Sequence, residues 1–376
     1  MVQNKTDVLI FIEDPGAANY VAGLPSIFSR LGISFRLLAD GLAKTCLKDR
    51  GIYTEEIEQG VSGCQILAAV KPRLLLVGTA ENPDTLGLSL VHQAKLSGIE
   101  SIGAIDAYGN ADLRFRGRSG ESLTYATDWL FVPTELVKGS YVSLGYSADQ
   151  VIVCGHPYYD FVQETALRLT SKDRDDFRHR LFPGVSVDQK VLAFVSEGSA
   201  RIKPRTQTYL SECTLPCDGT SVGRTEIVLK EFLDAIKLVS PRPYMVLRPH
   251  PKDAIEDYAA YQGEFDLISS GGSSIECLYA ADFAVGMTGT VMMEAALLGM
   301  PSLAIVPRAA ELDLLPTIQS GITPFVTTRE QLRSTISDFV QNKMKMKPVD
   351  LDKVIVRGAL QRVVRFVQKR LEKVTD

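Results

Sequence analysis

The sequence of 376 residues lacks several features that mark common classes of protein. It has no excess of positive charge: 41 Lys and Arg face 45 Asp and Glu, and the net charge of −4 argues against a dedicated nucleic-acid binder. No secretion signal is visible, because residues 1–6 are polar and the apolar run that follows has the length of a strand. We therefore expect a cytoplasmic protein with no nucleic-acid partner.

Metal-binding and disulfide patterns are also missing. The six cysteines are scattered, and most lie in apolar surroundings that are typical of buried, reduced thiols. Cys213 and Cys217 are close together, but no histidine or second cysteine pair is near enough to complete a zinc site. No Asp-x-Asp triplet follows a predicted strand, so we expect metal-independent chemistry without a cofactor.

A long uncharged apolar run is the third absence. Residues 280–307 are mostly apolar, but Asp282, Glu294, three glycines and Pro301 interrupt them, whereas a membrane helix needs roughly 20 apolar residues. The pattern instead predicts a strand at 282–285, a turn, a helix at 291–298 and a strand at 302–306.

The turn of this segment contains Thr288, Gly289 and Thr290. A strand that leads through such a turn into a helix presents unpaired backbone N–H groups, which suit a phosphate. The threonine hydroxyls can alternatively only cap the helix. Both roles are compatible, because the capped turn can be the empty state of a phosphate site.

Elsewhere, short apolar runs alternate with helical patterns, which is typical of parallel sheets buried on both faces. We predict an α/β protein with two doubly wound, Rossmann-like domains and a ligand cleft between them. The predicted parts are an N-terminal domain (1–160), a charged helix and linker (161–189), a C-terminal domain (190–350) and a C-terminal helix (351–376). The polar segment 200–224 is interpreted as a surface loop near the cleft.

This organisation, with the turn at Thr288 and the ending Glu294-Ala-Ala-Leu-Leu-Gly-Met-Pro301, resembles the GT-B fold of nucleotide-sugar-dependent glycosyltransferases. Sugar-nucleotide 2-epimerases share that architecture. The segments Asp106-Ala-Tyr-Gly-Asn110, Arg114-Phe115 and Gly155-His156-Pro157 resemble bacterial surface-polysaccharide proteins of the same type. The resemblance implies a donor nucleotide on the C-terminal domain and an acceptor on the N-terminal domain.

Candidate donor-binding residues follow the predicted strands of the C-terminal domain. Arg248 and His250, in an Arg-Pro-His-Pro element, suit a phosphate by charge and N–H geometry, and the element resembles the His-Pro motif of bacterial sialyltransferases and teichoic-acid glycerophosphotransferases. The alternative is a structural histidine that caps a turn. Glu294, one helical turn beyond Thr290, is a candidate ribose ligand, a role that the fold family often gives to a Glu.

Two further loops have an ordinary alternative. Ser196 begins the first loop of the C-terminal domain, which commonly touches donor phosphates in GT-B proteins, although the neighbouring Glu197 would repel them. The loop Gly271-Gly272-Ser273-Ser274 either reaches the nucleotide or only caps a helix through Ser273.

Acceptor-side and catalytic candidates lie at strand ends of the N-terminal domain. Asp106 is the first choice for a general base, with Asn110 and Arg114 nearby on the acceptor side. Asp14 is a second candidate base or an ordinary helix N-cap, and its neighbour Glu13 is an acceptor-side candidate. His156 either orients the acceptor, serves as the base or stabilises the hinge between the domains.

The C-terminal helix carries seven Lys and Arg against three Asp and Glu over residues 351–376. We interpret it as a helix packed across the domains with a solvated basic face, the alternative being peripheral attachment to anionic lipid at the inner face of the membrane.

Together, these features predict an inverting glycosyltransferase that uses a nucleotide sugar and a glycan or lipid-linked acceptor of surface-polysaccharide biosynthesis. A 2-epimerase and a non-catalytic sugar-nucleotide-binding protein are the alternatives. The epimerase is disfavoured because the pattern typical of that family near the C-terminal turn, a Gly-Gly pair followed by a Glu pair, is absent from this sequence.

Overall fold

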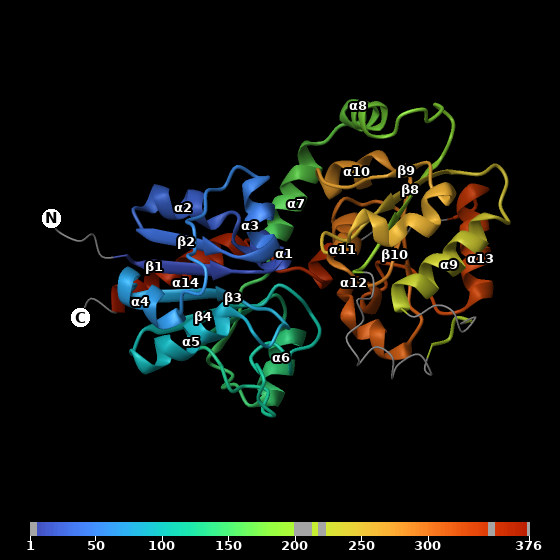
Figure 1. The fold of residues 1–376 in the computed structure, drawn as a ribbon. Helices are drawn as coiled ribbons and strands as arrows, with labels where there is room; N and C mark the ends of the chain where they lie inside the picture. Colours follow the sequence, from blue (N-terminus) through green and yellow to red (C-terminus); the bar gives the residue numbers. More distant parts are fainter. Residues whose placement is uncertain (1–5, 199–212, 217–222, 345–349, 374–376) are drawn as a thin grey trace. The chain divides into compact units, whose positions relative to one another are not determined.

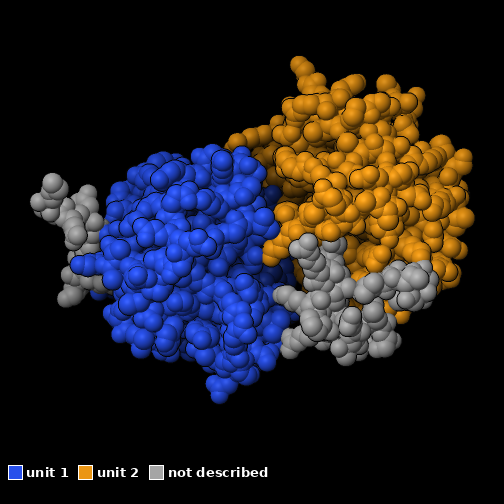
Figure 2. Space-filling model, viewed as in Figure 1, with its two compact units in different colours: residues 1–161, 354–376 blue, residues 162–353 orange. Residues whose placement is uncertain are grey.

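The computed structural model describes residues 6–198, 213–216, 223–344 and 350–373, and the chain divides into two compact units (Figures 1 and 2). Unit 1 comprises Met1–Phe161 and Val354–Asp376, and unit 2 comprises Val162–Lys353. Each unit contains a six-stranded sheet in which all neighbouring strands are parallel. None of the described helices is both long and apolar enough to cross a membrane.

The sheet of unit 1 has the strand order β2-β1-β3-β4-β5-β6. Alternate residues of its strands are buried under helices on opposite faces, which explains why the strands are apolar throughout. On one face, Ile10 packs with α1, α2, α3 and α14; on the other, Phe11 packs with α4 and α5. The strands are β1 (Val8–Ile12), β2 (Phe35–Ala39), β3 (Leu74–Gly78), β4 (Glu100–Ala104), β5 (Trp129–Val132) and β6 (Val151–Val153). The helices are α1 (Pro15–Val21), α2 (Leu24–Leu31), α3 (Gly41–Lys48), α4 (Gly63–Val70), α5 (Leu86–Leu96), α6 (Glu135–Leu144) and α14 (Ala359–Lys373).

The sheet of unit 2 has the order β12-β11-β10-β7-β8-β9. Phe194 of β7 packs against α9 and α13 on one face, whereas Val191 packs beside α8 and α10 on the other. The strands are β7 (Val191–Val195), β8 (Tyr244–Arg248), β9 (Leu267–Ile268), β10 (Phe283–Gly286), β11 (Ser302–Ile305) and β12 (Phe325–Val326). The α-helices are α8 (Ser171–Leu181), α9 (Arg224–Ile236), α10 (Ser274–Ala280), α11 (Thr290–Leu297), α12 (Pro316–Gln319) and α13 (Arg329–Val340). The 3₁₀ helices are η2 (Ile255–Glu264), η3 (Ala309–Leu314) and η4 (Leu351–Lys353).

The apolar segment 280–307 follows the predicted course. It forms β10, a turn at 287–289, α11 and β11; Asp282 directly precedes β10, and Glu294 lies within α11. Asp282 precedes β10 and accepts hydrogen bonds from Val191 N–H at 2.7 Å and from Arg178 at 3.0 Å. Arg174 of α8 donates to the same carboxylate at 2.5 Å. Asp282 therefore fastens α8 to the sheet.

The structure defines three boundaries in more detail. Residues 15–31 form two helices, α1 and α2, and a Cβ on Gly23 between them would lie 2.8 Å from the Leu360 side chain. The segment predicted as a helix and linker (161–189) contains the end of α7 (Pro157–Arg168) and the whole of α8. Of the predicted C-terminal helix, the part from residue 354 onward belongs to unit 1, and α14 itself begins only at Ala359.

Asp160 fixes the start of α14. Its carboxylate accepts hydrogen bonds from Gly358 N–H at 3.0 Å and from Leu360 N–H at 3.2 Å. Helix N-termini leave backbone N–H groups without intrahelical partners, so a carboxylate at this position supplies the missing acceptor and a favourable charge.

Candidate functional site

Asp106 and Arg114 form a buried ion pair at the carboxyl edge of the unit 1 sheet. Asp106 follows β4, and Arg114 Nη1 donates to its Oδ1 at 3.0 Å. Only 11% of the Asp106 side chain and 6% of the Arg114 side chain are exposed. The carboxylate also presses against the first turn of α1, because a Cβ on Gly16 would lie 1.7 Å from Asp106 Oδ2. The glycine in the Pro15-Gly16 turn thus makes room for the acid.

The charges around Asp106 act in opposite directions. Burial raises the pKa of its carboxyl, Arg114 lowers it, and the nearby charge of Asp14 raises it again, with a net rise. Asp14 occupies the N-cap position of α1, but its carboxylate does not form the capping hydrogen bond to that helix. The structure therefore gives Asp14 an electrostatic effect on Asp106 in place of the N-cap role.

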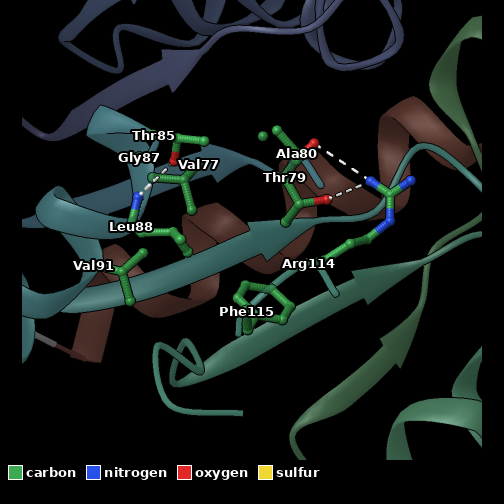
Figure 3. Close-up of a pocket in the computed structure, with 10 residues that line it drawn as sticks. Val77, Thr79, Ala80, Thr85, Gly87, Leu88, Val91, Arg114 and Phe115 are labelled. Atoms are coloured by element: carbon green, nitrogen blue, oxygen red, sulfur yellow. Dashed lines mark hydrogen bonds between the residues drawn. The ribbon is translucent and has the colours of Figure 1, made fainter. Parts of the chain in front are cut away.

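Arg114 connects Asp106 to the end of β3. Its Nη1 also donates to Thr79 Oγ1 at 3.0 Å, and its Nη2 lies 3.9 Å from Glu81 Oε1. Asn110 donates to the same Glu81 oxygen at 2.9 Å. Figure 3 shows the Thr79–Arg114 contact at one end of a small pocket and the Thr85 cap of α5 at the other. Thr79 and Glu81 were not among the residues predicted from the sequence.

Glu13 lies at the carboxyl end of β1 and is bound to the start of α5. Its carboxylate accepts hydrogen bonds from the Thr85 hydroxyl and from the N–H groups of Leu86 and Gly87. Burial is the largest effect on this group and raises its pKa to about 7, although the three donors oppose the rise. Glu13 therefore interacts with α5, whereas Asp14, the next residue, acts on Asp106.

His156 is buried, with 2% of its surface exposed, at the start of α7. Its Nδ1 accepts from Tyr158 N–H at 3.3 Å, and the ring donates to the backbone carbonyl of Asp106. The ring stacks on Tyr159 at 4.5 Å between centroids. Burial lowers its pKa to about 3. Both ring nitrogens are therefore engaged, and the contact of His156 with the Asp106 carbonyl positions the Asp106 backbone.

In unit 2, Glu197 lies on the turn that was predicted to bind phosphate. It follows β7, and its carboxylate accepts from the backbone N–H of Thr288 and from Nη1 of Arg224. Arg224, the first residue of α9, also donates to the Thr288 hydroxyl at 3.2 Å. The side chain of Glu197 abuts Gly289, where a Cβ would lie 3.2 Å from its Cγ. A carboxylate of the chain itself thus lies at the N-terminus of α11.

Two more charges extend this pair. Glu311, with 2% of its surface exposed, lies 2.8 Å from Arg224 Nε and also pairs with Arg308, which follows β11. Burial alone would raise the pKa of Glu197, but Arg224 and the Thr288 N–H lower it overall. The four side chains form an alternating series, Glu197–Arg224–Glu311–Arg308, in which each charge has an opposite neighbour.

Arg248 and His250 are both at the carboxyl end of β8, as predicted. The Arg248 guanidinium donates to the carbonyls of Ser269 at 3.2 Å and Gly272 at 2.9 Å, and also to that of Gly271. It thereby holds the loop before α10. His250 Nδ1 accepts from Lys252 N–H at 3.1 Å, and a Cβ on Gly198 would lie 3.6 Å from the same nitrogen. His250 therefore lies beside Gly198, the residue that follows Glu197.

The remaining donor candidates differ in accessibility. Thr288, Gly289 and Thr290 are partly exposed, and no described side chain forms the N-cap hydrogen bond of α11. Glu294, one turn further, is 3% exposed.

Ser196 is buried and its hydroxyl lies 2.6 Å from the Tyr258 hydroxyl, which in turn donates to Asp253 at 2.6 Å. The Ser196 hydroxyl is thus engaged in a buried contact within unit 2. Ser273 caps α10 by accepting from Glu276 N–H at 3.3 Å, in agreement with the capping alternative.

Arg224 and Glu311 were missed because their sequence surroundings give no motif. The predicted loop 200–224 ends at Arg224, whereas residues 199–212 and 217–222 lie outside the described part of the chain. The useful signal would have been the cost of burying a charge: Glu197, directly after a buried strand, needs a cation, and Arg224 begins the next amphipathic helix.

The apolar face of α14 is used within unit 1, where Val363, Val364 and Val367 belong to the core under the sheet. Arg370 donates to Glu100 at 2.9 Å. The exposed cations lie on one helical face: Arg362, Arg365, Lys369 and Lys373. Any contact of this helix with lipid would therefore be electrostatic, without insertion of apolar side chains.

No family model and no curated protein matches this sequence. Solved structures do match. UDP-GlcNAc 2-epimerase from Neisseria meningitidis, bound to UDP-GlcNAc, is 15% identical with a TM-score of 0.66, and the match covers 96% of this chain and 100% of that chain. The MnaA–UDP structure from S. aureus is 12% identical with a TM-score of 0.66, covering 99% and 98%. The wall teichoic acid polymerase TagF is 13% identical with a TM-score of 0.54, covering 98% and 90%.

These likenesses cover nearly the whole chain, and the proteins concerned are enzymes of the GT-B architecture. At identities this low, they establish the fold and leave the reaction open. With its two Rossmann-like units of six parallel strands each, the chain has the GT-B-like fold that the sequence predicted.

Proposed function

We propose that this protein is an enzyme that binds a nucleotide sugar on unit 2 and transfers the sugar to a glycan or lipid-linked acceptor bound by unit 1. The observation that carries the proposal is the position of the charged groups. In each unit they gather at the carboxyl edge of the parallel sheet, where ligands bind in open α/β folds. In unit 2 they surround the N-terminus of α11.

The donor phosphates are assigned to the turn Thr288–Gly289–Thr290. Backbone N–H groups and the helix dipole favour an anion there, and Arg224 adds a cation in contact with the Thr288 hydroxyl. His250 flanks the neighbouring loop and supplies a second group of suitable chemistry. Glu294, one turn along the same helix, is assigned to the ribose.

The acceptor hydroxyl is assigned to Asp106 as general base of an inverting, metal-independent transfer. A raised pKa favours proton uptake, and protonation relieves the repulsion from Asp14. Arg114 and the Asp106 backbone contact with His156 fix the carboxyl in one orientation. Asp106 is then the group that touches substrate, and Arg114 and His156 position it.

The donor assignment is tested by thermal shift with UDP, GDP, CMP and CDP, because a ligand that binds the folded state raises the melting temperature. Thr290→Val and His250→Ala should abolish the shift given by the best nucleotide. Asp106→Asn should keep the shift and lose transfer. Unchanged nucleotide binding in both unit 2 variants would contradict the donor assignment.

A 2-epimerase is the second candidate, because the epimerase structures match this chain over 96% or more of its length. Incubation with UDP-GlcNAc in the absence of acceptor separates the two. Epimerised sugar or released UDP, followed by NMR, would favour the epimerase, whereas a transferase leaves the substrate unchanged until an acceptor is added. A protein that only binds would show the thermal shift, no turnover in either assay, and no effect of Asp106→Asn.

A further inference from the structure

The N-terminus of α11 is already occupied by an anion that belongs to the chain. Glu197 accepts from the Thr288 N–H and from Arg224, which are the two groups best suited to a donor phosphate. Its side chain is 23% exposed, and Thr288 and Gly289 beneath it are partly exposed, so a ligand from solvent can reach this place. A phosphate cannot use these donors while the carboxylate holds them.

We propose that Glu197 is an internal competitor for the donor phosphate: an anionic ligand must displace its carboxylate from Thr288 and Arg224, and Arg224 then binds the phosphate. This inference rests on the assignment of the donor to α11. It adds two residues, Glu197 and Arg224, whose roles the sequence motifs do not indicate, and it makes donor affinity dependent on the release of Glu197.

The arrangement of charges permits that release. Arg224 stays paired when Glu197 leaves, because Glu311 Oε1 lies 2.8 Å from its Nε. A phosphate that replaces Glu197 therefore finds a cation whose position is already fixed, and no buried charge is left without an opposite neighbour.

A like charge within a few ångströms opposes phosphate binding, so its removal should strengthen binding. Glu197→Gln keeps the shape of the side chain and removes the charge. We expect UDP and inorganic pyrophosphate to bind this variant at least about tenfold more tightly than the wild type, measured by isothermal titration calorimetry. Arg224→Gln should weaken both ligands at least about tenfold.

Glu311→Gln is the matched control, since it removes one negative charge from the same cluster without releasing Thr288. With Glu311 neutral, Arg224 binds Glu197 more strongly, and nucleotide binding should stay unchanged or weaken. Tighter binding in both variants would indicate a general effect of charge and would overturn the proposal. Thermal unfolding without ligand checks that each variant is folded.

The structure of the wild-type protein with UDP gives a second test that needs no variant. The Thr288 N–H should donate to a phosphate oxygen, with the Glu197 carboxylate turned away. The proposal that Glu197 competes with the phosphate is refuted if the wild type binds UDP while Glu197 still accepts from Thr288 N–H, or if Glu197→Gln binds UDP no better than the wild type. Either result leaves the assignment of the donor site to α11 unaffected. If neither wild type nor Glu197→Gln binds any nucleotide, the donor assignment fails together with it.

Discussion

Two buried titratable side chains give unit 1 opposite dependences of stability on pH. Burial lowers the pKa of His156 from 6.5 to about 3, so between these values the unfolded chain binds a proton that the folded state does not. Stability from this group is present above its unfolded pKa and is lost as the pH falls. Burial raises the pKa of Glu13 from 4.5 to about 7, so here the folded state binds the extra proton. Stability from Glu13 therefore increases as the pH falls from about 7 toward 4.5.

The two effects are of similar size. Between about pH 7 and about pH 5, the His156 shift costs about 2 kcal/mol of unfolding free energy, and the Glu13 shift contributes about 2 kcal/mol. In the wild type they nearly cancel in this interval. Removing either group should therefore make the pH dependence contributed by the other visible in the unfolding free energy.

Relative to the wild type, His156→Gln should gain about 2 kcal/mol of stability on acidification from about pH 7 to about pH 5, because the opposing His156 term is removed. Glu13→Gln should lose about 2 kcal/mol over the same interval. Each substitution also changes packing and hydrogen bonds, but these costs are nearly the same at both pH values. The change with pH thus isolates the titration.

Urea unfolding followed by tryptophan fluorescence suits this test, because the single tryptophan of the sequence, Trp129, lies in β5 of unit 1 and packs on Phe366. The signal reports the unit that contains both titrating groups. Parallel pH dependences in the wild type and both variants would refute the reasoning, since they would mean that neither group has a different pKa in the folded state.

The remaining predictions concern packing and ion pairs. Gly16→Ala should displace the Asp106 carboxylate and destabilise unit 1 by about 1–3 kcal/mol in the same fluorescence assay, whereas Gly120→Ala, with open space around its Cβ, should change little; equal effects would contradict the close approach. Asp282→Asn should destabilise unit 2 by about 1–3 kcal/mol, because an amide cannot pair with both arginines of α8. Far-UV circular dichroism measures this loss, and the exposed Asp176→Asn is the control; a loss no larger than in that control would show that the anchor is unimportant.

Much of the fold follows from local pattern. Continuous apolar runs such as residues 8–12 and 191–195 indicate strands buried on both faces, and the intervening helices make a parallel sheet the only economical arrangement. The segment 280–307 was predictable from the same kind of local pattern, because its glycines and its proline lie at or next to element ends. Helix α8 has no buried residue of its own, so the high charge of segment 161–189, and not an apolar periodicity, indicated a helix there.

The candidate site was predictable only by position. Asp106, Arg248 and Thr288 follow strands, and in a parallel sheet all strand ends of one kind meet at one edge. Whether a side chain there faces a ligand or serves the protein depends on contacts with distant residues. Arg248 holds a neighbouring loop, and His156 supports the Asp106 backbone, and neither contact has a local pattern.

The sequence by itself determined the two parallel sheets, the order of the elements and the strand-end location of the charged residues, because hydrophobic periodicity and turn residues act over a few positions. Only the tertiary structure decided that Glu197 lies on the Thr288 N–H, 91 residues away, and that Gly16 accommodates Asp106. Such pairs form because a buried charge must find a partner in space, and the nearest partner in space is set by how the strands are ordered in the sheet.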